Sequence, residues 1–129
     1  MVEPKKYDQI ANGCWVACLA GLTDIPHGEL AKTIPGGTFP LSTVKERNDY
    51  RNAVHDLLLK HGWAIALLWT KVPRGFAIAN GPTERNTVHS VLILDGVLWH
   101  DPHHSRAGLI HVDEYEVVVP IITASPGHV

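Results

Sequence analysis

Residues 9–22 constrain the fold of this chain most, because they join a polar turn to a stretch without charge. Residues 15–22 contain only apolar side chains and one glycine. A helix with almost no polar face has to be buried on most sides. We therefore predict that a helix starts at Cys14, after the turn-forming pair Asn12-Gly13, and lies at the centre of the core.

Cys14 is the first candidate for chemistry. At the start of a helix, free backbone N–H groups and the positive end of the helix dipole favour an anion. The pKa of a thiol in that position can fall from about 8.5 into a range of roughly 3.5 to 7.5. The alternative is that Cys14 fills the core, as many free cysteines do. We expect that role for Cys18, one helical turn further along.

Length and charge limit the classes of protein that this chain can represent. The chain has 129 residues and a net charge of −2. Its length fits a single domain, residues 1–129, that can bury a core without a metal or a disulfide.

The charge balance gives no basic surface, so we expect no nucleic-acid partner. Short apolar runs and a charged N-terminus lead us to expect a cytoplasmic protein that does not bind a membrane. The oligomeric state stays open.

Helical signals dominate the first half of the chain. Pro26 suits the first turn of a short helical piece near residues 27–33. Thr43 and Glu46 form a capping box, and apolar positions recur at helical spacing until Gly62, which predicts a long helix between them.

Strand signals dominate the second half. We predict buried strands at residues 64–69 and 75–79, a turn at 80–83, and a hairpin with strands at 88–94 and 97–101. A last strand at 114–122 is expected near a sheet edge, because Pro120 cannot donate to a ladder. The fold class is therefore α+β, with N-terminal helices packed on a C-terminal antiparallel sheet.

His89 and Asp101 could complete the requirements of a cysteine nucleophile, which needs a base and a group that orients the base. They lie at the same end of the predicted hairpin. They share a face only if the loop has three residues, 94–96, with Gly96 in a bulge; a two-residue loop with a regular ladder puts them on opposite faces. We predict the three-residue loop.

This set of residues resembles the papain-like cysteine peptidase superfamily. The resemblance lies in Gln9, Gly13-Cys14-Trp15, a histidine that opens a strand (His89), and Asp101-Pro102 closing the next strand. Within the superfamily it is closest to the bacterial double-glycine leader peptidases of bacteriocin exporters. The resemblance implies a papain-like fold and a peptide or protein substrate, with no cofactor. The short chain would suit a phage or mobile-element product that acts in a bacterial cytoplasm.

The resemblance also implies a role for each residue. Cys14 would be the nucleophile, His89 the general base and Asp101 its orienting partner. The side-chain amide of Gln9 and the backbone N–H of Cys14 would bind the oxyanion. The same residues serve acyl transfer, and the sequence does not distinguish water from an amine as the acceptor.

Two residues are candidates for contact with the substrate. Trp15 follows the nucleophile directly, and Asn86 lies in the segment just before His89. We expect the loops at residues 34–42 and 80–87 to flank a cleft near Cys14.

Two alternatives stay open. The chain has nine histidines, and a metal-dependent hydrolase could use the ligands gathered late in the sequence, which are His100, Asp101, His103, His104 and His111. Neighbouring ligands in an extended segment point in alternate directions, and HExxH and CxxC patterns are absent from the sequence, so we predict no metal site. The other alternative is a non-catalytic, peptide-binding relative of the peptidases.

Overall fold

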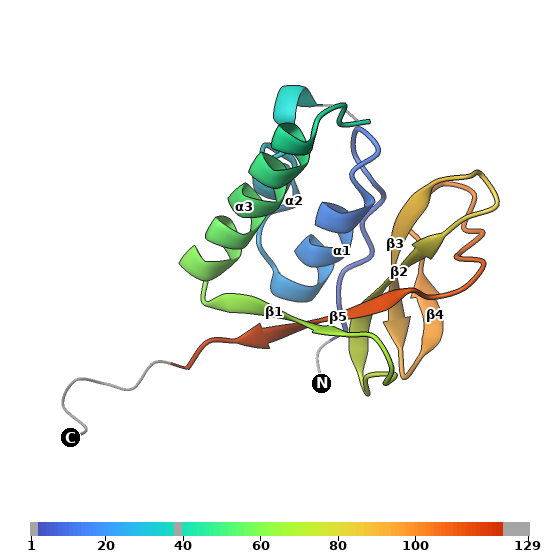
Figure 1. Cartoon of the computed structure of the whole chain (residues 1–129). Helices are drawn as coiled ribbons and strands as arrows, with labels where there is room; N and C mark the ends of the chain where they lie inside the picture. The colour runs from blue at the N-terminus through green and yellow to red at the C-terminus, as the bar shows by residue number, and fades with distance from the viewer. Residues whose placement is uncertain (1–2, 38–39, 123–129) are drawn as a thin grey trace, which may run out of the picture.

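The computed structural model describes residues 3–37 and 40–122. Its elements, in order, are α1 (Cys14–Thr23), α2 (His27–Ala31), the 3-10 helix η1 (Pro35–Gly37), α3 (Val44–Lys60), β1 (Trp63–Leu68), β2 (Phe76–Pro82), β3 (Val88–Leu94), β4 (Val97–His100) and β5 (Glu114–Pro120). The strands form one antiparallel sheet in the order β1-β5-β2-β3-β4. The helices gather on one side of this sheet (Figure 1). The predicted mixture of helices and an antiparallel sheet is confirmed.

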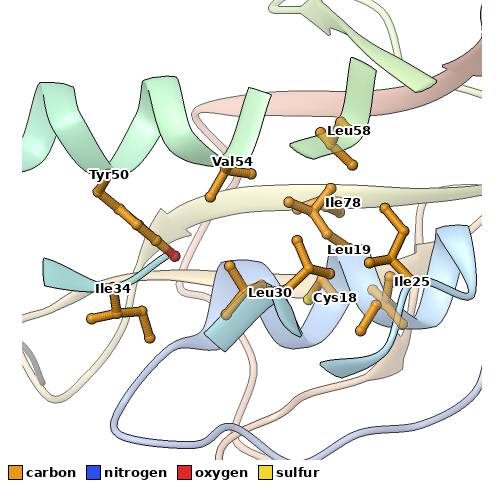
Figure 2. Packing of buried hydrophobic residues seen from close by; sticks show 12 residues of the cluster. Cys18, Leu19, Ile25, Leu30, Ile34, Tyr50, Val54, Leu58 and Ile78 are labelled. Atoms are coloured by element: carbon orange, nitrogen blue, oxygen red, sulfur yellow. The ribbon is translucent and has the colours of Figure 1, made fainter. Parts of the chain in front are cut away.

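Helix α1 occupies the centre of the main core, as its apolar sequence predicts. Five consecutive residues from Val16 to Ala20 are at most 1% exposed. Figure 2 shows Cys18 and Leu19 packed among side chains from α2, α3 and the sheet. The helix ends where Asp24 adopts a left-handed conformation (φ 60°) and donates its N–H to the carbonyl of Ala20. The position of Cys14 is thereby fixed at the head of a buried helix.

Helix α3 confirms the prediction from the capping box. The side chain of Thr43 accepts a hydrogen bond from the backbone N–H of Glu46 at 3.0 Å. Tyr50, Val54 and Leu58 are buried at intervals of four residues, so one face of α3 packs on the core. None of the helices in the described ranges is long and apolar enough to cross a bilayer.

Strand β2 continues further than expected, into the predicted turn at residues 80–83. Asn80 and Gly81 pair with Ser90 and His89 of β3. Asn80 is suited to this buried place because its side chain bonds to neighbouring strands. Gly81 is required because a Cβ there would lie 2.0 Å from the carbonyl oxygen of His111.

Strand β5 is an interior strand, so the prediction of an edge position was wrong. It pairs with β1 over residues 115–120 and with β2 over residues 114–116. Ile121 donates its N–H to the carbonyl of Gly62, next to β1. The nitrogen of Pro120 therefore faces the opposite side of β5, towards β2, at a point beyond the end of β2. Pro120 is tolerated because no strand there needs a donor. The edge strand next to β5 is β1, which is half-exposed where burial was expected.

The hairpin between β3 and β4 has a two-residue loop, so the predicted three-residue loop was wrong. Leu94 pairs with Val97, and the loop residues Asp95 and Gly96 both have positive φ angles (50° and 83°). The ladder is not regular: Ile93 pairs with Leu98, but Leu92 pairs with His100. Trp99 is therefore an extra residue in a β-bulge. The bulge shifts the register by one and returns Asp101 to the face that carries His89.

Candidate active site

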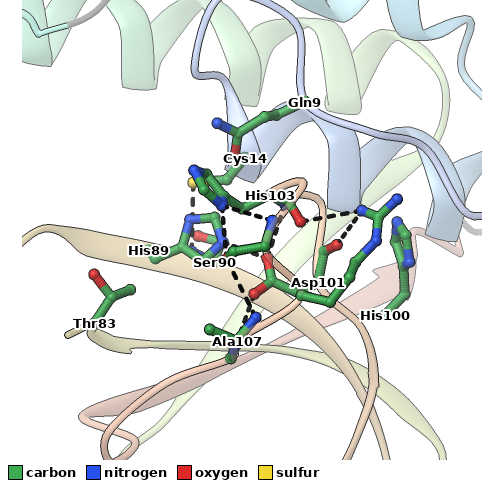
Figure 3. A network of polar contacts seen from close by, with 12 residues as sticks. Gln9, Cys14, Thr83, His89, Ser90, His100, Asp101, His103 and Ala107 are labelled. Atoms are coloured by element: carbon green, nitrogen blue, oxygen red, sulfur yellow. Dashed lines mark hydrogen bonds and ion pairs between the residues drawn. The ribbon is translucent and has the colours of Figure 1, made fainter. Parts of the chain in front are cut away.

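Three side chains from separate elements meet at the head of α1 (Figure 3). Cys14 is the first residue of α1, His89 is the second residue of β3, and Asp101 directly follows β4. His89 Nε2 lies 2.6 Å from Asp101 Oδ1, and both side chains are buried. The His89 ring and the Cys14 thiol lie close enough for each to shift the pKa of the other. Because Asp101 occupies Nε2, Nδ1 is the ring nitrogen left for the thiol.

The loop after β4 fixes the Asp101 carboxylate. Its Oδ1 accepts the backbone N–H of His103 and its Oδ2 accepts that of Gly108, both at 2.8 Å. Burial by itself raises the pKa of Asp101, but the bonds from His89 and these two amides lower the pKa below its ordinary value. Asp101 is therefore held as an anion facing His89.

The environment of Cys14 favours a thiolate next to an imidazolium. Burial, the largest single effect, raises the pKa of the thiol, but the hydrogen bond and charge of His89 and hydrogen bonds from Ser90 bring the pKa below its ordinary value. The backbone N–H of Ser90 donates to Cys14 Sγ at 3.4 Å. For His89, burial lowers the pKa, but the interactions with Cys14 and Asp101 raise it overall. Cys18 is fully buried and burial raises its pKa, which fits a core role.

Gln9 lies next to Cys14, as Figure 3 shows. Its backbone N–H donates to the carbonyl of Pro102 at 3.0 Å, which ties this segment to the residue after Asp101. Its side-chain Nε2 donates to Asn12 Oδ1 at 3.3 Å. An amide nitrogen carries two hydrogens, so one has no partner among these contacts, and the side-chain Oε1 is buried without a hydrogen-bond partner.

The backbone N–H of Cys14, expected as the second oxyanion donor, is already engaged. It donates to the carbonyl of Asn12 at 3.1 Å. Gly13, between them, has φ −83° and ψ 70°, which is the geometry of an inverse γ-turn. This N–H would have to leave Asn12 before it could bind a substrate oxygen.

A cleft of about 1000 Å³ is lined by Cys14 and His89, but not by Asp101, and reaches α3 on one side and the sheet on the other. Trp15 lines the cleft, whereas Asn86 does not. Asn86 sits in an exposed left-handed turn (φ 64°), and its neighbours Arg85 and Thr87 line the cleft instead. Both loops expected at the cleft contribute, the first through Pro40 and Leu41; its residues 38–39 lie outside the described residues.

Three polar residues of the cleft wall were not singled out from the sequence. Asn80, Ser90 and Glu116 come from β2, β3 and β5, and each is at most 9% exposed. The available signal was a polar residue inside an otherwise apolar strand, which is clearest for Glu116 between Tyr115 and Val117.

The ring centroids of His103 and His104 lie 4.2 Å apart, so the expectation that these neighbours point in alternate directions was wrong. The other histidines proposed as metal ligands point to different partners. His100 Nε2 donates to the carbonyl of Tyr7 at 3.0 Å, and His111 lies 2.9 Å from Asp113. His103 bonds to Ser105 while its ring packs edge-on against His89. Within residues 3–37 and 40–122, no three histidine, cysteine or carboxylate side chains come together as a metal site.

Comparison of the chain with protein-family models, with curated proteins and with solved structures gave no match. The assignment of a function therefore depends on the site itself. Chemically, the arrangement offers an ionisable sulfur, an imidazole that can take and return a proton, a carboxylate that holds the imidazole, and an amide next to the sulfur.

Proposed function

We propose that the protein is a thiol hydrolase of the papain-like type. The observation that carries this proposal is the buried hydrogen bond between His89 and Asp101, which leaves the second ring nitrogen of His89 for Cys14 at the head of α1. More particularly, we propose a cysteine peptidase similar to the double-glycine leader peptidases, acting on a peptide or isopeptide bond. The cleft beside Cys14 is large enough to hold several residues of an extended peptide.

The proposed first half-reaction uses Cys14 as the nucleophile. The thiolate attacks the carbonyl carbon, a C–S bond forms, and the electron pair moves to the carbonyl oxygen, where the Gln9 amide stabilises it. The imidazolium of His89 donates its proton to the leaving amine as the C–N bond breaks. A thioester between Cys14 and the acyl half of the substrate remains.

The second half-reaction reverses these roles. His89, now neutral, removes a proton from water, and the resulting hydroxide oxygen attacks the carbonyl carbon of the thioester. The C–S bond breaks, the acid leaves, and the Cys14 thiolate is restored next to protonated His89. Asp101 stabilises the imidazolium in both halves and keeps the ring in one orientation.

The direct test compares new protein termini in a bacterial lysate. Wild type, Cys14→Ala and Cys18→Ala are each added, and termini are identified by mass spectrometry. We expect termini that appear with wild type and with Cys18→Ala but not with Cys14→Ala. The same termini with Cys14→Ala would overturn the proposal. A native protein whose Cys14 fails to react with substrate-like thiol probes would favour the peptide-binding alternative.

A further inference from the structure

A chain of hydrogen bonds, buried within the sheet and part-buried at Trp15, connects the residue after the nucleophile to the residue after the base. Trp15 Nε1 donates to Glu116 Oε1 at 3.0 Å. Asn80 Nδ2 donates to Glu116 Oε2, and Ser90 Oγ donates to Asn80 Oδ1 at 2.6 Å. We call these four residues the clamp.

The clamp joins the elements that carry the catalytic pair. Trp15 is the covalent neighbour of Cys14 on α1, and Ser90 is the covalent neighbour of His89 on β3. Asn80 on β2 and Glu116 on β5 lie between them. In the sheet, β2 separates β5 from β3, so the bonds cross the sheet from strand to strand and end on the helix above it.

A carboxylate in this place needs a reason, because burying a charge is unfavourable unless it is well paired. Glu116 is 6% exposed, and its burial raises the pKa of the carboxyl. Each of its two oxygens meets a donor, one from α1 and one from β2. An apolar side chain would fill the space at lower desolvation cost, but it would form no hydrogen bond to α1 or β2.

We propose that Glu116 is a positioning residue of the proposed peptidase: through Trp15 and Asn80 it fixes α1 against β3 at the separation that Cys14 and His89 need. This inference rests on the proposed function. The position of β3 affects the sulfur directly, because the backbone N–H of Ser90 donates to Cys14 Sγ. A looser clamp lets that amide and the imidazole move away from the sulfur, and the thiolate loses stabilisation.

The test measures the rate at which iodoacetamide alkylates Cys14 as a function of pH, which requires no knowledge of the substrate. Glu116→Leu removes both acceptors and touches neither Cys14 nor His89. We expect its alkylation rate at pH 6 to be roughly three- to tenfold below that of wild type, with the midpoint shifted to higher pH, which is the scale of one lost hydrogen bond. A purely structural role would lower stability to urea but leave the midpoint of the folded protein unchanged.

A second variant keeps the test decisive should Glu116→Leu fail to fold. Asn80→Leu removes the donor to Glu116 and the acceptor of Ser90 and leaves Cys14, His89 and Ser90 in place. We expect its pH midpoint for alkylation of Cys14 to shift upward, as in Glu116→Leu. A wild-type pH profile in a folded Asn80→Leu or Glu116→Leu protein would overturn the clamp.

The outcomes separate the clamp from the proposed function. If wild type has a low pH midpoint for alkylation of Cys14 and the variants keep it, the proposal about the clamp is wrong and the peptidase proposal stands. A wild-type midpoint near the ordinary thiol value of about 8.5 contradicts the peptidase proposal and the clamp together.

Discussion

The imidazole of His89 is held from both sides. One ring nitrogen bonds to Asp101, and the other is left to Cys14. The partners of Asp101 are equally specific, because two backbone amides of the following loop bind the same carboxylate. At the scale of single residues, the site is a set of donors and acceptors that each have an assigned partner, with the Gln9 amide as the group that retains spare capacity.

Gln9→Ala should slow the attack of Cys14 on a carbonyl carbon without changing the alkylation of the Cys14 thiol. An oxyanion donor of this kind typically contributes about 10² to 10³ to turnover, whereas alkylation of the sulfur passes through no oxyanion. We expect hydrolysis of p-nitrophenyl acetate to fall by about that factor, with alkylation of Cys14 by iodoacetamide unchanged. Cys14→Ala gives the background rate. An unchanged ester rate in Gln9→Ala would remove Gln9 from the mechanism.

Asp101→Asn should destabilise the protein in a pH-dependent way. The new amide faces at least one donor at a buried position, which costs about 1 to 3 kcal/mol at pH 7. The folded-state pKa of Asp101 is lowered, so the stability that this carboxylate contributes is present above its unfolded pKa of about 3.9 and is lost as the pH falls through the folded pKa. Urea unfolding at pH 7 and pH 3 should therefore show a smaller difference between variant and wild type in acid. An equal difference at both pH values would contradict this account.

At the scale of elements, the bulge in β4 determines whether His89 and Asp101 can meet. A two-residue turn with a regular ladder would direct His89 and Asp101 to opposite faces. The extra residue, Trp99, changes that facing within one strand. Its ring packs against Phe76, and Lys6 lies over it, so the bulged residue is itself anchored.

Deletion of residue 99 should therefore disrupt the site although it removes neither Cys14, His89 nor Asp101. Without the bulge, Asp101 turns away from His89, and we expect the pH midpoint for alkylation of Cys14 to rise by about one unit, equivalent to roughly tenfold slower alkylation below it. Trp99→Phe is the matched control, because it keeps the bulge and the contact with Phe76. A deletion variant that is folded and keeps the wild-type midpoint would show that the bulge does not orient Asp101.

Helices were more predictable than strand order. The apolar run of α1 and the capping box of α3 are local signals, and both helices begin where these signals place them. Strand order depends on which distant segments pair, and Pro120 was a misleading guide because only one side of β5 is paired at that point. The continuation of β2 through Asn80 was hidden for a similar reason, since its partners lie on other strands.

At the scale of the whole molecule, one helix serves both the core and the site. Cys14 stands where α1 meets the cleft, and Cys18, one turn later, is fully buried among α2, α3 and the sheet. Two chemically identical thiols in one helix therefore have opposite environments.

Native protein should react with iodoacetamide at one thiol only. At neutral pH we expect Cys14 to be alkylated and Cys18 to remain unmodified, because the first has a lowered pKa and an open cleft and the second a raised pKa and no access. In urea, both should be alkylated at similar rates. Peptide mapping by mass spectrometry measures each site. Equal labelling of both cysteines in the folded protein would contradict the structure around α1.

The sequence by itself determined the two main helices, the start of α1 at Cys14, and the order of the residues that could form a site, because these follow from local periodicity, capping and spacing. Only the tertiary structure decided that His89 and Asp101 face each other, through a bulge that leaves no clear local signal. It alone revealed the clamp, and it showed the Cys14 amide engaged with Asn12 and Asn86 outside the cleft lining. These features depend on register and on contacts between segments far apart in the chain, and a one-residue shift in a strand reverses every side chain beyond it.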